Sequence, residues 1–329
     1  MKKKDRTELR SADLKSLKLG RYPWKAGVKY FMIKREPFLS SSTIEENTRK
    51  LLMIGNVLTE LKSKGIVGTT DPRSMTAGDV EGLLLWMKKH GLEISTREKY
   101  LSISNSYLKF FGNSAIEQIR IEQGRILPPK PLKTIHALNI EELQLVFKAL
   151  DEVGGHKGQI LKGMISLAFC TGGRPKEILL SEVRDLDLKN DRFFVRHPKG
   201  EESWAAAQWV PLIRGDMLPN LREYKLYRES ISCGTYLFPN PTTKKPYSLN
   251  SIRKWCREIS ASTGVMIRLK DMRSTLASLT VKGDLGRLKA VSLQLRHTKL
   301  STTEHFYARI NEGEIEHEIG DAWRDNPIE

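Results

Sequence analysis

The spacing of apolar residues predicts a small all-helical module over residues 43–112. Three stretches there repeat apolar residues at helical spacing, and each begins with a Ser or Thr three residues ahead of an acidic residue. This capping-box pattern is typical of helix starts, and it begins here at Thr43, Thr76 and Ser95. We interpret the aromatic stripe of the third stretch as helix core rather than as a platform for stacked bases. The stripe consists of Tyr100, Ile103, Tyr107, Phe110 and Phe111.

A different pattern occupies the second half of the chain. Helical spacing marks Ile140 to Leu150 and Ile160 to Phe169. Strand-like apolar residues broken by turn sequences follow between Val183 and Leu212, which predicts an antiparallel sheet of about three strands. Helical spacing returns at Ser248 and continues to the end. The expected fold class is therefore mainly α with a small antiparallel β-sheet, an all-α domain followed by an α+β domain.

Composition suggests where these parts meet. Residues Pro128, Pro129 and Pro131 stand among basic residues without helical or strand period, and we interpret their surroundings as an extended linker. The last residues carry an amphipathic helical pattern. The expected parts are a basic N-terminal segment at 1–40, a helical domain at 41–113, the linker at 114–137, the α+β domain at 138–310 and a tail helix at 311–329.

The charge balance narrows the class of partner. The 329 residues include 55 Lys and Arg against 39 Asp and Glu, a formal charge of +16. Such a surplus favours a polyanion: nucleic acid first, an acidic membrane surface second. Residues 1–140 carry 26 basic and 14 acidic side chains, whereas residues 311–329 carry seven acidic side chains and the single Arg324. Solubility alone is the alternative explanation for the charge of both ends.

Other classes are disfavoured by the sequence. No apolar stretch approaches the ~18 residues that a membrane span needs, and no apolar run follows the basic N-terminus as in a secretory signal. The three cysteines, Cys170, Cys233 and Cys256, are scattered without CxxC spacing, which argues against a disulfide framework or a zinc cluster. We therefore expect a soluble cytoplasmic protein.

Chemistry-bearing residues gather next to turns of the second domain. Arg174 lies in a glycine turn before a helix, Arg273 follows a strand-like segment, and His297 precedes a segment that contains Tyr307. Arginines, a histidine, a lysine and a tyrosine are the groups that stabilise a pentavalent phosphorane while a phenol attacks. Each signal alone has an ordinary structural explanation, and only their joint occurrence in one domain points to phosphoryl transfer.

The ordered motifs TGGRPKE, HPKGEE, LKDMRST, LRHTKLSTT and FY resemble those of the tyrosine recombinase (phage-integrase) family. Among its members the chain looks most like archaeal or mobile-element integrases or Xer-type recombinases. The resemblance implies a helical, SAM-like core-binding domain followed by a catalytic domain with the DNA breaking-rejoining fold. It also implies an enzyme, a site-specific recombinase that cleaves and rejoins double-stranded DNA through a 3′-phosphotyrosyl intermediate. That mechanism needs neither a metal nor a cofactor.

The resemblance also implies a role for each matching position. Arg174 and Arg273 would contact the scissile phosphate, His297 would donate a hydrogen bond to it, and Glu177 would hold Arg174 in place. Lys199, in the turn HPKGEE, would protonate the leaving 5′ oxygen. Lys176 and Lys189 lie nearby as competitors for that role, and Tyr307 would be the nucleophile.

Two positions depart from the family pattern. Lys270 stands where the family usually has a histidine. Some members, and the related type IB topoisomerases, also have a lysine at this position. Because lysine is a poor general base unless its pKa is lowered, the route by which Tyr307 loses its proton stays open. Many members have the tyrosine one residue earlier, where this chain has Phe306, so Tyr307 is the local nucleophile candidate.

Assembly and alternatives follow from the same resemblance. The acidic tail helix would pack on a neighbouring protomer, or alternatively within its own chain. Packing between protomers would give a homo-tetramer on two DNA sites, and no membrane contact is expected. A monomer without DNA is compatible with this expectation, and the expected location is the cytoplasmic nucleoid. The competing functions are a type IB topoisomerase-like nicking-closing enzyme and a non-catalytic DNA-binding derivative of the fold.

Overall fold

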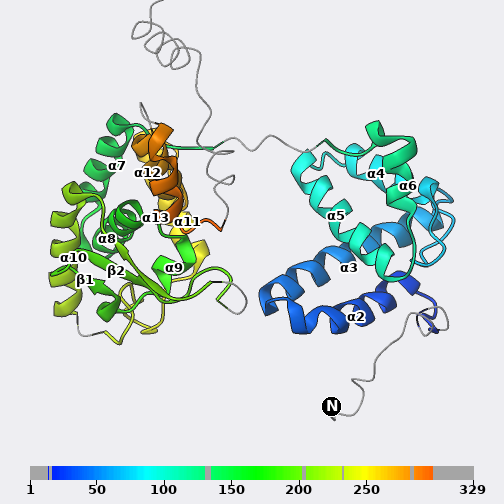
Figure 1. The fold of residues 1–329 in the computed structure, drawn as a ribbon, viewed down its shortest axis with the longest axis horizontal. Coiled ribbons are helices and arrows are strands. Elements are labelled where there is room, and N and C mark those ends of the chain that lie inside the picture. Colours follow the sequence, from blue (N-terminus) through cyan, green and yellow to red (C-terminus); the bar gives the residue numbers. More distant parts are fainter. Residues whose placement is uncertain are drawn as a thin grey trace, which may run out of the picture. The chain divides into compact units, whose positions relative to one another are not determined.

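In the computed structural model the chain forms two compact units, Met1–Leu132 and Lys133–Glu329 (Figure 1). Within the described residues, no helix is long and apolar enough to cross a membrane. The structure describes residue 14 and residues 17–129, 135–201, 205–231, 233–281 and 285–298.

The first unit is entirely helical in its described part. The Thr76 capping box predicted from the sequence is confirmed, since the Thr76 side chain accepts from the Asp79 amide and the Thr76 amide donates to Asp79 Oδ2 at 2.9 Å. The helices are α2 (Pro23–Arg35), α3 (Ser41–Ser63), α4 (Ala77–Lys89), α5 (Ile94–Phe110) and α6 (Ala115–Glu122), with short 3-10 turns η1 (Glu36–Phe38) and η2 (Gly124–Ile126).

The aromatic stripe of α5 lies in the core, as expected. Tyr107 is fully buried, its ring centroid lies 4.6 Å from that of Trp24, and its hydroxyl donates to the Trp24 carbonyl at 2.6 Å. The Trp24 indole in turn donates to the Leu51 carbonyl at 2.8 Å, which ties α2 to α3. Burial of the phenol also raises the pKa of Tyr107 well above its usual range.

Two expected boundaries are wrong. The expected basic N-terminal segment at 1–40 is in part packed structure, because α2 buries Trp24, Val28 and Phe31 in the core of the first unit. The expected linker at 114–137 begins with helix α6, which buries Ile116 and Ile119. Each of these two helices buries an apolar face, and this burial stabilises a packed structure although the basic and proline-rich composition predicts an extended chain.

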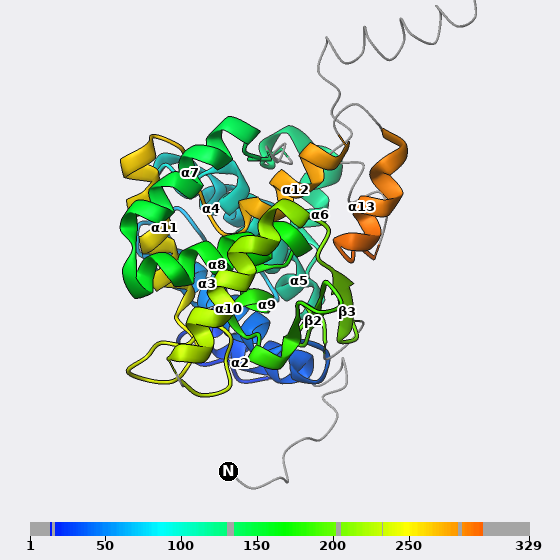
Figure 2. The ribbon, with the colours of Figure 1, turned by 90° about the vertical axis from the view of Figure 1, so that its left-hand side faces the viewer.

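The second unit packs around helix α8, which is buried along most of its length. Helices α7, α10 and α12 pack against α8 (Figures 1 and 2). The helices are α7 (Ile140–Val153), α8 (Gly155–Thr171), α9 (Pro175–Leu179), α10 (Leu218–Ser230), α11 (Leu249–Thr263), α12 (Asp271–Val281) and α13 (Leu288–Gln294), with 3-10 turns η3 (Val183–Asp185), η4 (Gly215–Met217) and η5 (Leu285–Arg287).

A three-stranded antiparallel sheet lies beside these helices, as the sequence predicts. Its order is β1 (Leu186–Asp187), β2 (Arg192–Val195) and β3 (Gln208–Pro211). Phe193 pairs with Val210 and both are buried, whereas Phe194 pairs with the exposed Trp209 on the opposite face. The mainly α fold class with a small antiparallel sheet is therefore confirmed, and the β2–β3 connection carries Lys199.

Candidate active site

A sharp turn between α8 and α9 sets the position of Arg174. Helix α8 ends at Thr171 and is capped by Gly172, whose φ of +62° is in the left-handed region that favours glycine. The Thr171 hydroxyl donates to the Leu167 carbonyl at 2.7 Å and accepts from the Gly173 amide at 3.1 Å. Pro175 then starts α9, so Arg174 occupies the position that caps this helix.

The buried carboxylate of Glu177 holds Arg174 from one side. Arg174 donates from its amide to Glu177 Oε2 at 2.8 Å and from Nη1 to Oε1 at 2.9 Å. The Glu177 side chain is only 1% exposed, whereas that of Arg174 is 24% exposed. Burial alone would raise the pKa of Glu177, but Arg296 and Arg174 outweigh it, and the pKa lies below its usual value. The carboxylate is therefore ionised and orients the arginine.

Arg273 of α12 joins the same turn. Its Nη1 donates to the Gly172 carbonyl at 2.6 Å, and its Nη2 donates to the Leu295 carbonyl. The two residues that follow Arg273 in α12 are anchored separately, because Ser274 Oγ donates to the His136 carbonyl at 2.6 Å and Thr275 Oγ1 accepts from the Leu138 amide at 2.9 Å. Arg273 is thus fixed between the end of α8 and the end of α13.

His297 follows α13 and lies within the electrostatic influence of this cluster. Burial lowers its pKa, and the charges of Arg273, Arg174 and Arg296 lower it further, to about 4. The imidazole is therefore neutral near pH 7. A neutral ring keeps one N–H donor that can point at an anion without adding charge. Arg174, Glu177, Arg273 and His297 thus come together from three separate chain segments.

The remaining site residues of the sequence prediction do not join this cluster in the described part of the chain. Lys199 lies exposed in the turn after β2, and Lys270 lies exposed just before α12. Tyr307 lies outside the described residues.

Arg296 has no role that the sequence alone reveals, and the structure places it against Glu177. Its side chain is 7% exposed, and its Nη2 donates to Glu177 Oε2 at 2.6 Å. The partner carboxylate lies 119 positions earlier in the chain, so no local pattern reveals the pair. The adjacency to His297 was the single signal available from the sequence.

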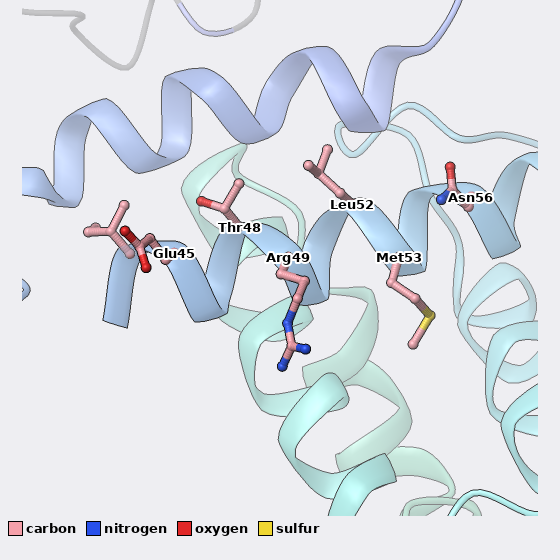
Figure 3. Close-up of a pocket in the computed structure, with 7 residues that line it drawn as sticks. Glu45, Thr48, Arg49, Leu52, Met53 and Asn56 are labelled. Carbon is pink, nitrogen blue, oxygen red and sulfur yellow. The ribbon is translucent and has the colours of Figure 1, made fainter. Parts of the chain in front are cut away.

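Other features of the described residues offer no competing catalytic centre. No group of three or more His, Cys, Asp or Glu side chains is placed there to hold a metal ion. A cavity of about 580 Å³ lies in the first unit, and Figure 3 shows its labelled side chains projecting from α3. These are Glu45, Thr48, Arg49, Leu52, Met53 and Asn56, with Ile44 completing the lining, a set without a nucleophile and base in contact.

Comparison with known proteins places this geometry in a family. The chain is 24% identical over 291 residues to the tyrosine recombinase XerC of Staphylococcus carnosus (strain TM300), covering 84% of this chain and 89% of that protein. Its fold is similar to the Tn1549 transposon integrase in complex with transposon right end DNA, at 14% identity and a TM-score of 0.67, covering 90% of this chain and 98% of that one. It is also similar to lambda integrase in a tetramer bound to a Holliday junction, at 15% identity and a TM-score of 0.61, covering 87% and 78% of the two chains. The phage integrase family model matches residues 136–314, more than half of the chain. The chain therefore belongs to the phage integrase family, the tyrosine recombinases that its motifs resemble.

Proposed function

We propose that this tyrosine recombinase cleaves and rejoins duplex DNA at specific sites, and that the cluster around Arg174 binds the scissile phosphate. The observation that carries the proposal is the convergence of Arg174 and Arg273 at one turn. Each guanidinium is oriented by its own acceptors, a carboxylate for Arg174 and two carbonyls for Arg273. Donors fixed in this way stabilise developing charge without reorganising during the reaction.

The proposed step at the phosphate uses these donors together. Arg174 and Arg273 bind the non-bridging oxygens, whose negative charge grows in the pentavalent transition state. The neutral His297 donates a further hydrogen bond. The low pKa of His297, about 4, supports a role as hydrogen-bond donor rather than as a third cation.

The covalent step is assigned to Tyr307. Its phenolate oxygen attacks phosphorus, forming a 3′-phosphotyrosyl bond, while the bond to the 5′ oxygen breaks and Lys199 protonates that leaving oxygen. A 5′-hydroxyl from a second strand then attacks the phosphotyrosine and releases the tyrosine. Lys270 stands where relatives usually have histidine, and we assign it the role of accepting the Tyr307 proton or of neutralising negative charge at the phosphate. The bond energy is conserved in the covalent link, so the cycle requires no external energy source.

In this proposal the first unit binds the DNA backbone. Residues 1–140 carry most of the basic surplus, and side chains such as Arg21 and Lys29 on or beside α2 are exposed. Positive side chains at the backbone bind DNA by releasing condensed counterions. The lambda integrase tetramer on a Holliday junction supports a homo-tetramer on two DNA sites. We place its activity in the cytoplasm, on nucleoid DNA.

A two-site assay tests the proposed function against its alternatives. A plasmid carrying two copies of the DNA that flanks the gene is incubated with the enzyme, beside a matched plasmid without those copies. Recombinant products from the first plasmid alone support site-specific recombination. Relaxation of both plasmids without recombinants indicates a nicking-closing enzyme, and binding without any strand cleavage indicates a non-catalytic DNA-binding protein.

The proposed tetramer has its own test in the acidic tail. Truncation after Asn311 removes the amphipathic pattern of Ile315, Ile319, Ala322 and Trp323. If the tail packs on a neighbouring protomer, the truncated protein binds single sites normally and fails to pair two of them. Unchanged recombination overturns packing between protomers and favours packing within one chain.

A further inference from the structure

Arg296 occupies a backbone position that normally belongs to glycine. Helix α13 ends in a Schellman motif, in which the His297 amide donates to the Ser292 carbonyl at 3.0 Å and the Arg296 amide donates to the Leu293 carbonyl at 2.9 Å. The residue at this point of the motif has a left-handed backbone, and Arg296 has a φ of +54°. A side chain with a Cβ atom is strained there, so arginine is retained at a cost.

The side chain of Arg296 carries a second cost. It is 7% exposed, and its Nε is buried without a hydrogen-bond partner among the described residues. A buried cation whose donors are not all satisfied is unfavourable unless a specific ion pair offsets its desolvation. Its Nη1 donates to the Gln294 carbonyl at 3.2 Å, and its one anionic contact in the described structure is Glu177.

Glu177 is shared between two guanidinium groups. Its Oε1 accepts from Arg174 Nη1 at 2.9 Å, while its Oε2 accepts from Arg296 Nη2 at 2.6 Å. One negative charge thus faces two positive charges inside the protein, and a net positive charge remains. If Glu177 paired with Arg174 alone, the carboxylate would neutralise the arginine that it orients. The second arginine removes this conflict between orienting Arg174 and preserving its charge.

We propose that Arg296 is a positioning residue that holds the Glu177 carboxylate, so that Glu177 can align Arg174 without cancelling its charge toward the scissile phosphate. The inference rests on the proposed function of Arg174. Arg296 itself does not touch the substrate in this account. Its effect reaches the phosphate through Glu177 and Arg174, two residues that contact each other directly.

The test compares two DNA substrates that differ in charge at the scissile position. One carries the ordinary phosphodiester, and in the other a methyl group replaces one non-bridging oxygen, which removes the negative charge. For Arg296→Gly we expect cleavage of the phosphodiester to slow by about tenfold or more, and cleavage of the neutral substrate by less than about threefold. Arg296→Lys should fall between Arg296→Gly and the unchanged protein on the phosphodiester, because lysine keeps the charge but lacks the planar fork.

A matched control separates this effect from loss of structure. Arg228 is another buried arginine of the same unit, but it donates to the carbonyls of Tyr236, Cys233 and Gly234. Arg228→Met should slow cleavage of both substrates by the same factor. The double variant Arg296→Gly with Glu177→Gln should recover part of the phosphodiester cleavage that Arg296→Gly loses, because the uncompensated carboxylate is gone.

The results distinguish failure of the proposed function from failure of the proposed role of Arg296. An unchanged protein that cleaves neither substrate overturns the proposed function. An unchanged protein that cleaves both, with Arg296→Gly slowing both equally or slowing neither, overturns the role of Arg296 alone. A thermal melt of each variant accompanies the rates, and Arg296→Lys retains the test if Arg296→Gly does not fold.

Discussion

Replacement of Gly172 by alanine tests the turn on which the site is built. A Cβ atom at this position would lie 2.4 Å from Leu295 Cδ2 and 3.2 Å from Leu276 Cδ2, and the backbone φ is +62°. The carbonyls of Gly172 and Leu295 also accept hydrogen bonds from Arg273. The added methyl group therefore strains the backbone, displaces Leu295 and disturbs Arg273 at the same time.

The magnitude follows from two contributions. A left-handed residue with a Cβ atom costs roughly 1 kcal/mol, and overpacking of a tight core costs about 1–3 kcal/mol. The free energy of unfolding should therefore fall by about 2–4 kcal/mol. A domain of this size loses roughly 2–4 °C of Tm per kcal/mol, which gives a decrease of about 4–16 °C.

Gly264→Ala provides the matched control. Gly264 ends α11 with a φ of +72°, but a Cβ atom there would meet no atom within 4 Å. This variant should lose only the backbone contribution, about 1 kcal/mol, and retain DNA cleavage. Gly172→Ala should lose more stability and also cleavage, measured by thermal melts and by single-turnover cleavage. Equal Tm decreases for the two variants would refute the packing argument.

Three further outcomes are expected. Lys199→Ala should cleave ordinary DNA slowly but regain its cleavage rate on a substrate with sulfur as the bridging 5′ atom, since a thiolate leaves without a proton. Lys189→Ala is the control and should cleave ordinary DNA normally. If Lys199→Ala loses the same factor in rate on both substrates, the acid role is contradicted. Removal of the exposed Arg21 and Lys29 charges should reduce the magnitude of the negative slope of log affinity against log salt by about 1–2. An unchanged slope would place both charges away from DNA. The folded pKa of His297 is about 4 against 6.5 for an ordinary histidine, so the unfolded chain takes up its proton first as pH falls. Stability contributed by neutral His297 should thus be complete above pH 6.5 and decline toward pH 4, and His297→Asn should flatten this part of the Tm–pH curve; identical curves contradict the shift.

Motif order identified residues that the fold brings together. Arg174, Arg273 and His297 are far apart in sequence, yet the ordered motifs predicted one site, and the structure gathers them around a single turn. Their roles at the phosphate remain predictions. Family motifs carry this information because each one pairs a local turn with a chemically required side chain. The contact of Arg273 with Gly172 and Leu295 is a tertiary contact, which local spacing does not encode.

Features that depend on a partner far away in the chain are not visible in the sequence. Helix α2 is rich in lysine, and its composition obscured the apolar face that carries Trp24 and Phe31. Helix α6 has only eight residues, too few for periodicity to outweigh the prolines that follow it. Arg296 occupies a turn position that favours glycine, and its contact with Glu177 lies 119 positions away in the sequence. Such exceptions to local preference are expected where function or tertiary pairing compensates for strain.

Covalent capture of DNA tests the central claim most directly. A suicide substrate, nicked so that the cleaved 5′ end diffuses away, is incubated with the unchanged protein and with Tyr307→Phe, and the products are separated under denaturing conditions. The account predicts a protein–DNA species for the unchanged protein, joined through the 3′ phosphate to the peptide containing Tyr307, and none for the variant. Absence of this species from the unchanged protein, or its persistence in Tyr307→Phe, would contradict the account.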